Sequence, residues 1–184
     1  MQFKETPIPG LYVVEPVVHG DARGFFYEQF HAIEFQSHGL AAQYLQDNCS
    51  SSQQWTLRGL HYQRAPYAQT KLVRAMVGRI LDVALDIRPD SPTFGQHYAV
   101  ELSDENHLAL YIPKGFAHGF LALSERAVIT YKCDALWHAA SEGGIAYNDP
   151  ALSIAWPLQG NAPILSDKDK KWPTLQAAQR EGLL

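Results

Sequence analysis

The chain has 184 residues, of which 46% are hydrophobic and 18% charged, as expected for one domain over residues 1–184 with a substantial core. Its net charge of −4 and pI near 6.0 exclude a broadly basic surface for nucleic acid, and no apolar run approaches the ~20 residues that span a membrane. The two cysteines, Cys49 and Cys133, have no CxxC spacing, and the N-terminus lacks an apolar secretion signal. We therefore expect a cytoplasmic protein that binds neither nucleic acid nor membranes.

Short segments rich in aromatic and branched residues begin the chain. Residues 10–16 and 24–30 have the composition of strands, and they flank a polar turn at residues 19–23. Apolar residues before Gly39 predict a short helix after these strands. The N-terminal part is therefore expected to be mainly β.

Two later stretches, residues 58–63 and 113–118, each place a histidine in a strand-like setting. In the first, His61 and Gln63 fall on the same side of the strand because side chains alternate. In the second, the Pro-x-Gly-x-x-His spacing predicts a tight turn at the glycine and a strand on which His118 points inward. We interpret the two stretches as two walls of one pocket.

The remaining predicted elements are mostly strands. Residues 71–77 and 80–86 meet across a Gly-Arg pair and are predicted to form a hairpin. Further strands are predicted at residues 98–102, 107–112, 118–123 and 127–133. A second helix is predicted at residues 173–180, with Pro near its start and Gly after its end. This pattern favours an all-β sandwich or barrel with an interior cavity.

Ordered motifs cover almost the whole chain. They lie at residues 21–26, 46–48, 57–63, 71–74, 86–88, 91–95, 112–120, 131–133 and 165–169. With these motifs the chain resembles the dTDP-4-dehydrorhamnose 3,5-epimerase family of nucleotide-sugar epimerases. The resemblance implies a cupin-type jelly-roll barrel with a few short peripheral helices, no cofactor, and epimerisation of dTDP-4-dehydro-6-deoxyglucose at carbons 3 and 5 to dTDP-4-dehydrorhamnose.

This chemistry needs three kinds of group. A ketone at carbon 4 makes the hydrogens on carbons 3 and 5 acidic, so inversion requires a base, an acid on the opposite face, and a donor for the enolate oxygen. His61 is the candidate base, because imidazole titrates near neutral pH, and Asp169 is the candidate carboxylate that orients it. Tyr131 is the candidate acid, and Lys71 the candidate donor to the enolate. Along residues 71–74, side-chain alternation sends Lys71 to one face of the strand and Leu72 to the other. The resemblance implies the same four roles.

Each of the four residues also has an ordinary structural explanation. A lone His61 is more often a core histidine bonded to a carbonyl, and Asp169 has the spacing of a capping box with Ser166. Tyr131 fits a common strand aromatic, and Lys71 fits a solvated surface. Residue types alone favour these explanations, and only the resemblance reverses them.

The other candidates are polar side chains suited to a nucleoside diphosphate sugar. Guanidinium and ammonium groups pair with a diphosphate, and amides or carboxylates bond sugar hydroxyls or the base. The diphosphate candidates are Arg23, Arg58 and Lys168, and the hydroxyl or base candidates are Gln46, Asn48 and Glu28. The resemblance implies that Asp47, His118 and Glu142 also contact the substrate and that Trp137 stacks on the base, and we add Gln63. The resemblance implies that the residue matching Arg23 often reaches a neighbouring subunit, and hence a homodimer.

Two positions depart from the family pattern. Trp137 stands where relatives commonly have Tyr, which keeps the stacking surface but removes a hydroxyl. His19 stands where an apolar or aromatic residue is frequent. The change at Trp137 leaves the base preference open, and the change at His19 affects contacts near the nucleotide. Neither touches the proposed proton-transfer residues, but both leave open whether one carbon or two are inverted.

We expect no bound metal. Metal sites in such barrels need several converging His and carboxylate ligands, and here Gln63 stands in place of a second His with no Glu at the usual offset. Three alternatives to the double epimerase stay open: an epimerase that inverts one carbon, a metal-dependent cupin, and a non-catalytic barrel that binds a nucleotide sugar.

Overall fold

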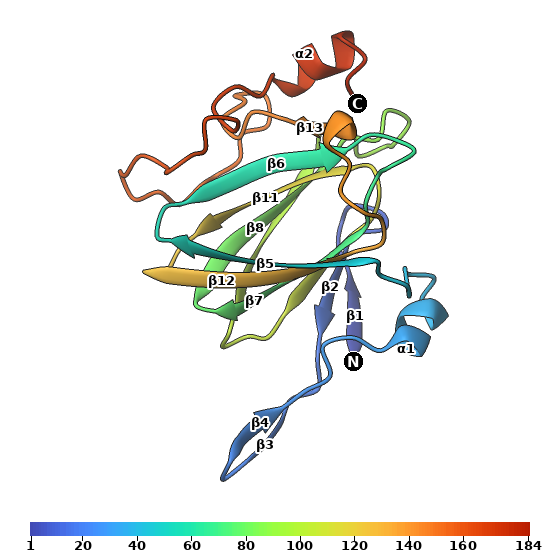
Figure 1. The fold of residues 1–184 in the computed structure, drawn as a ribbon, viewed down its shortest axis with the longest axis vertical. Helices are drawn as coiled ribbons and strands as arrows, with labels where there is room; N and C mark the ends of the chain where they lie inside the picture. The colour runs from blue at the N-terminus through green and yellow to red at the C-terminus, as the bar shows by residue number, and fades with distance from the viewer.

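The computed structural model describes residues 1–184 and contains two packed β-sheets (Figure 1). The six-stranded sheet has the order β1-β2-β10-β7-β12-β5, and the five-stranded sheet the order β13-β6-β11-β8-β9. All pairings within them are antiparallel. The predicted all-β class is confirmed.

The elements have the following bounds. The six-stranded sheet contains β1 (Gln2–Glu5), β2 (Tyr12–Glu15), β5 (Gln46–Gln53), β7 (Lys71–Val77), β10 (Ala109–Ile112) and β12 (Arg126–Cys133). The five-stranded sheet contains β6 (Leu57–Gln63), β8 (Arg79–Asp86), β9 (His97–Ser103), β11 (Phe116–Ala122) and β13 (Glu142–Gly144). A separate hairpin contains β3 (His19–Asp21) and β4 (Gly24–Phe26), and the helices are α1 (Ala32–Ser37), η1 (Ala139–Ser141) and α2 (Leu175–Arg180).

The main core lies between the two sheets, because alternate residues of each strand face inward. Val73 and Leu110 enter it from the six-stranded sheet, and Ile80, Ala84 and Phe120 from the five-stranded sheet. This alternation confirms the expected division of β7, in which one set of side chains faces the interior and the other faces outward.

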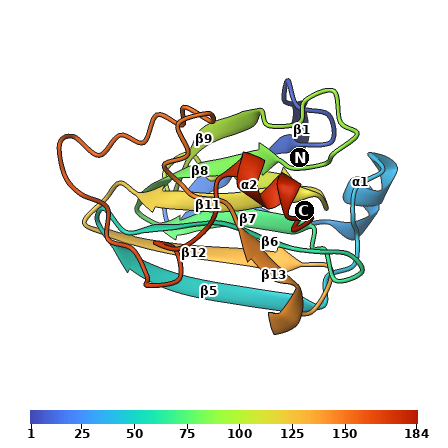
Figure 2. The same cartoon turned by 90° about the horizontal axis from the view of Figure 1, so that it is seen from above.

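The two helices pack against the outer faces of the sheets, and Figure 2 shows α2 lying over the five-stranded sheet. Phe35 of α1 packs against Val14 and Leu72 on the six-stranded sheet, and Leu175 of α2 packs against Val83 on the five-stranded sheet. The predicted helix at the C-terminus begins two residues later than expected, after the N-cap of Thr174. Neither helix is long and apolar enough to cross a membrane.

The predicted hairpin of residues 71–77 and 80–86 is wrong. Strand β7 pairs with β10 and β12, whereas β8 pairs with β9 and β11, so consecutive strands enter different sheets. Gly78 turns the chain between the sheets with φ +69°, and a Cβ there would overlap Ser124. A glycine with positive φ serves a hairpin and a crossing between sheets equally well, so the local sequence could not distinguish them.

The N-terminal prediction also needs correction. Residues 24–30 form a strand only at Gly24–Phe26, which pairs with His19–Asp21 inside the expected turn. The resulting hairpin projects from the body of the molecule (Figure 1). Strand β5 was not predicted because its sequence, QDNCSSSQ, has few residues that favour β-structure.

Candidate active site

A cavity of about 790 Å³ opens between the two sheets and the C-terminal segment at residues 164–169. Nine of the predicted site residues line it: Arg58, His61, Lys71, His118, Tyr131, Trp137, Glu142, Lys168 and Asp169. A recess of about 100 Å³ shares several of these residues and adds Gln46, Asn48 and Gln63. The fold therefore brings twelve of the fifteen candidates to one place.

His61 and His118 lie side by side on one wall of the cavity. Their Cα positions are register partners on β6 and β11, which are neighbours in the five-stranded sheet. A Cβ at Gly59 would lie 2.5 Å from the Cα of Gly119, so glycines allow these strands to approach closely. The interpretation of two walls is therefore corrected, because the opposite wall consists of Lys71 on β7 and Tyr131 on β12.

His61 is held by a buried carboxylate. Its Nε2 lies 2.5 Å from Oδ1 of Asp169, whose side chain is only 3% exposed. The same Oδ1 accepts a hydrogen bond from Trp172 Nε1 at 3.1 Å, and the Trp172 ring lies edge-on to the imidazole. A carboxylate that accepts from Nε2 leaves Nδ1 of His61 unprotonated in the neutral ring, and Nδ1 has no partner in the protein.

The charge state of Asp169 suits a carboxylate that holds His61 in place. Burial raises the pKa of its carboxyl, but hydrogen bonds from His61, Ser166 and Trp172 outweigh burial and leave the pKa below its usual value. Asp169 is therefore ionised at neutral pH and can stabilise a protonated His61. A group of this kind orients a catalytic imidazole and favours its charged form.

The capping-box explanation of Asp169 is wrong. Its backbone N–H does donate to Oγ of Ser166 at 3.1 Å, but the bond closes a turn and no helix follows directly. The carboxylate instead crosses to His61 on another element. The turn at Ser166 thus positions Asp169 at the cavity.

Tyr131 and Lys71 face His61 from the opposite sheet. Burial raises the pKa of the Tyr131 phenol, and the neighbouring Cys133 acts in the same direction, so the phenol is protonated at neutral pH. Burial lowers the pKa of Lys71, which forms no ion pair in the protein. The cavity thus places a protonated phenol and a lysine amine without an ion-pair partner across from an imidazole.

Polar residues continue toward the mouth of the cavity. Lys168 Nζ pairs with Glu142 Oε1 at 2.6 Å, and Arg58 Nε donates to Ser52 Oγ at 3.1 Å. Trp137 is 59% exposed at the rim, where its indole is available to stack on a flat ligand. These groups suit a ligand with negative charge and an aromatic base.

Gln63 has a supporting position. Its amide N–H groups donate to the carbonyls of Tyr67 and Leu136, and its Oε1 accepts from the backbone N–H of His138. All of its polar groups are thus bonded to backbone, so the structure disfavours its prediction as a substrate-binding residue. Gln63 instead holds the loop that carries Trp137.

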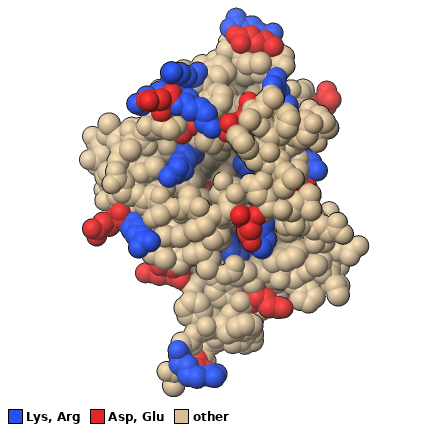
Figure 3. Space-filling model, viewed as in Figure 1, with Lys and Arg blue, Asp and Glu red and all other residues tan.

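Three candidates are not brought to the cavity. Asp47 lies on the outer side of β5 and pairs with Lys132 at 2.7 Å. Glu28 lies near the hairpin β3–β4, and Arg23 at its tip pairs with Asp21 and is 91% exposed. Figure 3 shows a cluster of both signs of charge at the lower tip of the molecule, where Figure 1 shows the hairpin, and charge of both signs scattered over the rest of this face.

Two residues of the site were not predicted from the sequence. Trp172 contributes the second donor to Asp169, and Asp82 forms a second carboxylate–imidazole pair with His118 at 2.8 Å. Asp82 had a usable signal, because it is a lone charge within the apolar run of β8. Trp172 had none, since a tryptophan near the C-terminus fits ordinary packing equally well.

No group of three or more His, Cys, Asp or Glu side chains is arranged to hold a metal ion. His61 and His118 each bond a different aspartate through Nε2. The expectation that no metal is bound stays a prediction.

Comparisons with known proteins agree with the geometry. The family model described as dTDP-4-dehydrorhamnose 3,5-epimerase matches residues 5–177. A protein of that name from Escherichia coli is 46% identical over 185 residues, and the match covers 100% of both chains. The resemblance drawn from the ordered motifs is confirmed.

Solved structures extend the comparison to the fold. A dTDP-6-deoxy-D-glucose-3,5-epimerase from Legionella pneumophila, in complex with dTDP-4-keto-L-rhamnose, superposes with a TM-score of 0.94 at 47% identity and covers 100% of this chain and 96% of that one. A 3'-monoepimerase from Streptomyces bikiniensis, in complex with dTDP-quinovose, has a TM-score of 0.92 at 38% identity, with coverage of 97% and 90%. The predicted jelly-roll fold class is thereby confirmed.

Proposed function

The chain belongs to the dTDP-4-dehydrorhamnose 3,5-epimerase family, and from this premise we propose that it inverts carbons 3 and 5 of dTDP-4-dehydro-6-deoxyglucose to give dTDP-4-dehydrorhamnose. One observation carries the proposal: the His61–Asp169 pair and Tyr131 stand on opposite walls of one cavity. Inversion requires removal of a proton from one face of a carbon and its return to the other face. The double epimerase is favoured over the single one, because the relative named as a 3,5-epimerase covers the full chain at higher identity.

The first step is removal of the proton next to the ketone. Nδ1 of His61 takes the hydrogen of carbon 5 or carbon 3 as a proton, and the electron pair of the broken bond moves onto the oxygen of carbon 4. Asp169 stabilises the imidazolium through its bond to Nε2. The ammonium of Lys71, which lines the same cavity, donates to the enolate oxygen.

The second step returns a proton from the opposite wall. Tyr131 donates its phenolic proton to the same carbon, and the enolate electrons form the new C–H bond. The phenolate then takes a proton from solvent while His61 releases one, so the enzyme returns to its starting state. The same sequence repeats at the other carbon.

The nucleotide is assigned to the mouth of the cavity. Arg58 and Lys168 supply positive charge for the diphosphate, and Trp137 supplies a stacking surface for the base. Glu142 holds Lys168 in place through a bond of 2.6 Å. Gln46 and Asn48, which are bonded to each other at 2.9 Å, face the adjoining recess and can contact hydroxyl groups.

A homodimer is part of the proposal. Arg23 and Glu28 lie away from the cavity of their own chain, on or beside a projecting hairpin whose Phe25 and Phe26 are 63% and 67% exposed. Exposed aromatic side chains of this kind are typical of an interface. Sedimentation of wild type and of a Phe25→Asp/Phe26→Asp variant tests it, with Ile33→Asp on α1 as control. A monomeric wild type would contradict the dimer.

Two further predictions accompany the proposal. We treat residues 1–184 as one domain, because the cavity is built from both sheets and the C-terminal segment together. We keep the cytoplasm as the compartment, since Cys49 and Cys133 are unpaired thiols.

The test is incorporation of solvent deuterium into dTDP-4-keto-6-deoxyglucose, followed by NMR. Wild type is expected to label carbons 3 and 5, and His61→Ala to label neither. Tyr131→Phe is compared with Tyr98→Phe, which removes a hydroxyl from a core-packed tyrosine outside the cavity. Only Tyr131→Phe should lose inversion.

Other outcomes distinguish the alternatives. Label at a single carbon would identify a single epimerase, and exchange that requires added metal would favour a metal-dependent cupin. Binding of the nucleotide sugar without any label would reduce the protein to a binding barrel. Each of these results would replace the double epimerisation with the alternative that it supports.

A further inference from the structure

Asp82 is a buried carboxylate without an evident structural purpose. It lies on β8 between Ile80 and Ala84, whose side chains belong to the core between the sheets, and its side chain is fully buried. Oδ1 accepts a hydrogen bond from Nε2 of His118 at 2.8 Å, whereas Oδ2 has no partner. A half-satisfied carboxylate in an apolar core is destabilising, so a reason to keep it should lie outside packing.

The surroundings of Asp82 point to the active site. His118 lines the cavity, and Lys71 faces the same interior from the opposite sheet. The other titratable groups around Lys71 are His61 on β6, Tyr131 and Cys133 on β12, and Glu142 on β13. Asp169 and Glu142 already bond His61 and Lys168, whereas Asp82 has a buried oxygen without a hydrogen-bond partner.

The charge state of Lys71 depends on this neighbour. Burial lowers the pKa of Lys71, and negative charge at Cys133, Asp82 and Glu142 opposes that effect. Burial raises the pKa of the Cys133 thiol to about 11, so this group is neutral near pH 7 and contributes no charge there. Asp82 and Glu142 are therefore the two carboxylates that favour the charged form of Lys71, and Asp82 is the one inside the core between the sheets.

We propose that Asp82 is a positioning residue of the active site, acting through His118 and Lys71. Its bond to His118 keeps the proton on Nε2 and leaves Nδ1, which has no partner in the protein, as a hydrogen-bond acceptor at the cavity. Its free oxygen supplies the counter-charge that keeps Lys71 an ammonium. The second role rests on the proposed function, in which that ammonium stabilises the enolate.

The kinetic test compares Asp82→Asn with Asp86→Asn, a change of a second fully buried aspartate on the same strand that lies outside the cavity. For Asp82→Asn we expect kcat to fall ~100-fold with KM changed less than ~3-fold, because the enolate donor acts in the transition state. The alkaline limb of the kcat profile should move to lower pH, since Lys71 with less compensating negative charge loses its proton earlier. Asp86→Asn should keep the wild-type limb. An Asp82→Asn enzyme with wild-type kcat and limb would overturn the proposal.

A second measurement on the ligand-free protein separates this inference from the proposed function. Nitrogen-15 NMR of the histidines should show neutral His118 with its proton on Nε2, and titration of carbon-13-labelled lysine should show Lys71 losing its proton at lower pH in Asp82→Asn. These signals decide the role of Asp82 even if wild type exchanges no substrate hydrogens. If Asp82→Asn does not fold, the wild-type spectrum remains decisive, because a proton on Nδ1 of His118 would overturn the assignment.

Discussion

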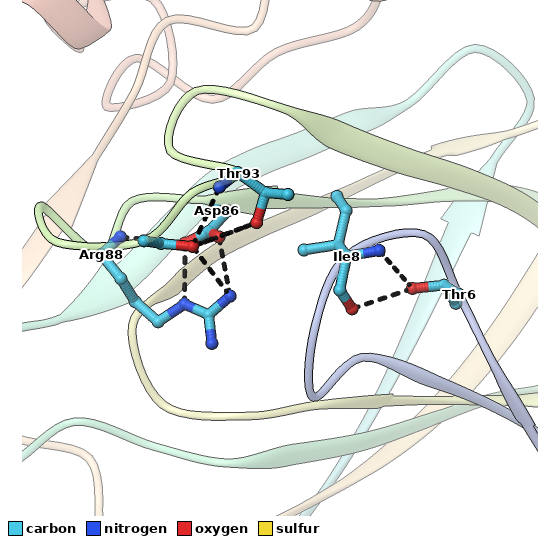
Figure 4. Close-up of polar contacts among 6 residues, drawn as sticks. Thr6, Ile8, Asp86, Arg88 and Thr93 are labelled. Carbon is cyan, nitrogen blue, oxygen red and sulfur yellow. Dashed lines mark hydrogen bonds and ion pairs between the residues drawn. The ribbon is translucent and has the colours of Figure 1, made fainter.

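Asp86 and Asp169 are both buried carboxylates, but they are bonded in opposite ways. Asp86 accepts from the backbone and guanidinium of Arg88, with Nε at 2.8 Å and Nη2 at 2.7 Å, and from the hydroxyls of Ser91 and Thr93 (Figure 4). Asp169 accepts from an indole and from the imidazole of His61. One carboxylate faces a permanent cation, and the other faces a group that titrates near neutral pH.

The difference separates a structural site from a chemical one. The bonds to Asp86 lie within one chain segment and fold the loop after β8, where the Arg88 guanidinium also lies over the Phe116 ring. The bond between Asp169 and His61 joins residues 108 positions apart and ends in an imidazole with a free nitrogen. Asp86, whose oxygens are bonded within its own loop, therefore maintains the fold. Asp169, which is bonded to an imidazole, is available to support proton transfer.

The largest expected effect is on catalysis at Asp169. In Asp169→Asn, the amide cannot compensate an imidazolium and does not hold the required tautomer of His61, so we expect kcat to fall about 10³-fold. The unfolding free energy should change by only about 1 kcal/mol, because Asn preserves the volume and can still accept from Trp172. Deuterium exchange and urea unfolding measure the two effects. A variant that unfolds more easily but retains kcat would place Asp169 with Asp86 as structural.

The reverse pattern is expected for Asp86→Asn. Loss of the charge leaves the Arg88 guanidinium without its carboxylate partner in a half-buried site, and this should lower the unfolding free energy by about 3 kcal/mol. The activity of the folded fraction should equal that of wild type, since Asp86 lies outside the cavity. Urea unfolding, with kcat measured on folded protein, tests this. A fall in kcat without loss of stability would contradict the assignment of Asp86 as a structural residue.

Lowering the pH should reveal the structural role of Asp86 in the wild-type protein. Burial raises the pKa of Asp86, but Arg88 and the hydroxyls of Ser91 and Thr93 more than offset it, and the pKa is about 2 against 3.8 for the free group. The folded pKa is depressed, so the associated stability, about 2 kcal/mol, is present above pH 4 and is lost as the pH falls toward 2. Unfolding free energies at pH 6 and pH 2.5 should therefore differ more in wild type than in Asp86→Asn. Equal differences in the two proteins would contradict this assignment.

The roles of Asp86 and Asp169 could be predicted from the sequence to different extents. The motif around Asp86 could be recognised in the sequence. Its hydrogen-bond partners lie within seven residues, however, and such residues are common in loops of any function. For Asp169, local spacing favoured a cap on Ser166, because nothing in a single sequence shows that a turn 108 residues away meets His61. The family resemblance supplied that long-range pairing, which local propensity cannot supply.

The fold was predicted in its class but not in its connections. Alternation on β7 correctly separated Lys71 from Leu72, since burial on one face is a local property. The hairpin across Gly78 was wrong, because the choice of partner strand depends on edges contributed by distant residues. Strand β5 lines the cavity with polar side chains, and it therefore lacks the alternating apolar residues by which strands are recognised in a sequence.

The smallest effect is expected at Trp172, where a single donor can be removed while the ring remains. Trp172→Phe deletes the Nε1–H that Asp169 accepts at 3.1 Å, and it retains an aromatic edge beside His61. A hydrogen bond to a charged group contributes about 1.5 kcal/mol, so kcat should fall about 10-fold. Because the same donor helps to depress the pKa of Asp169, its loss should move that pKa upward, toward its usual value. Carbon-13 NMR of the Asp169 carboxyl in wild type and in Trp172→Phe should show this shift. A fall in kcat as large as that of Asp169→Asn would mean that Trp172 holds the carboxylate in place, and that the pairing with His61 does not form without it.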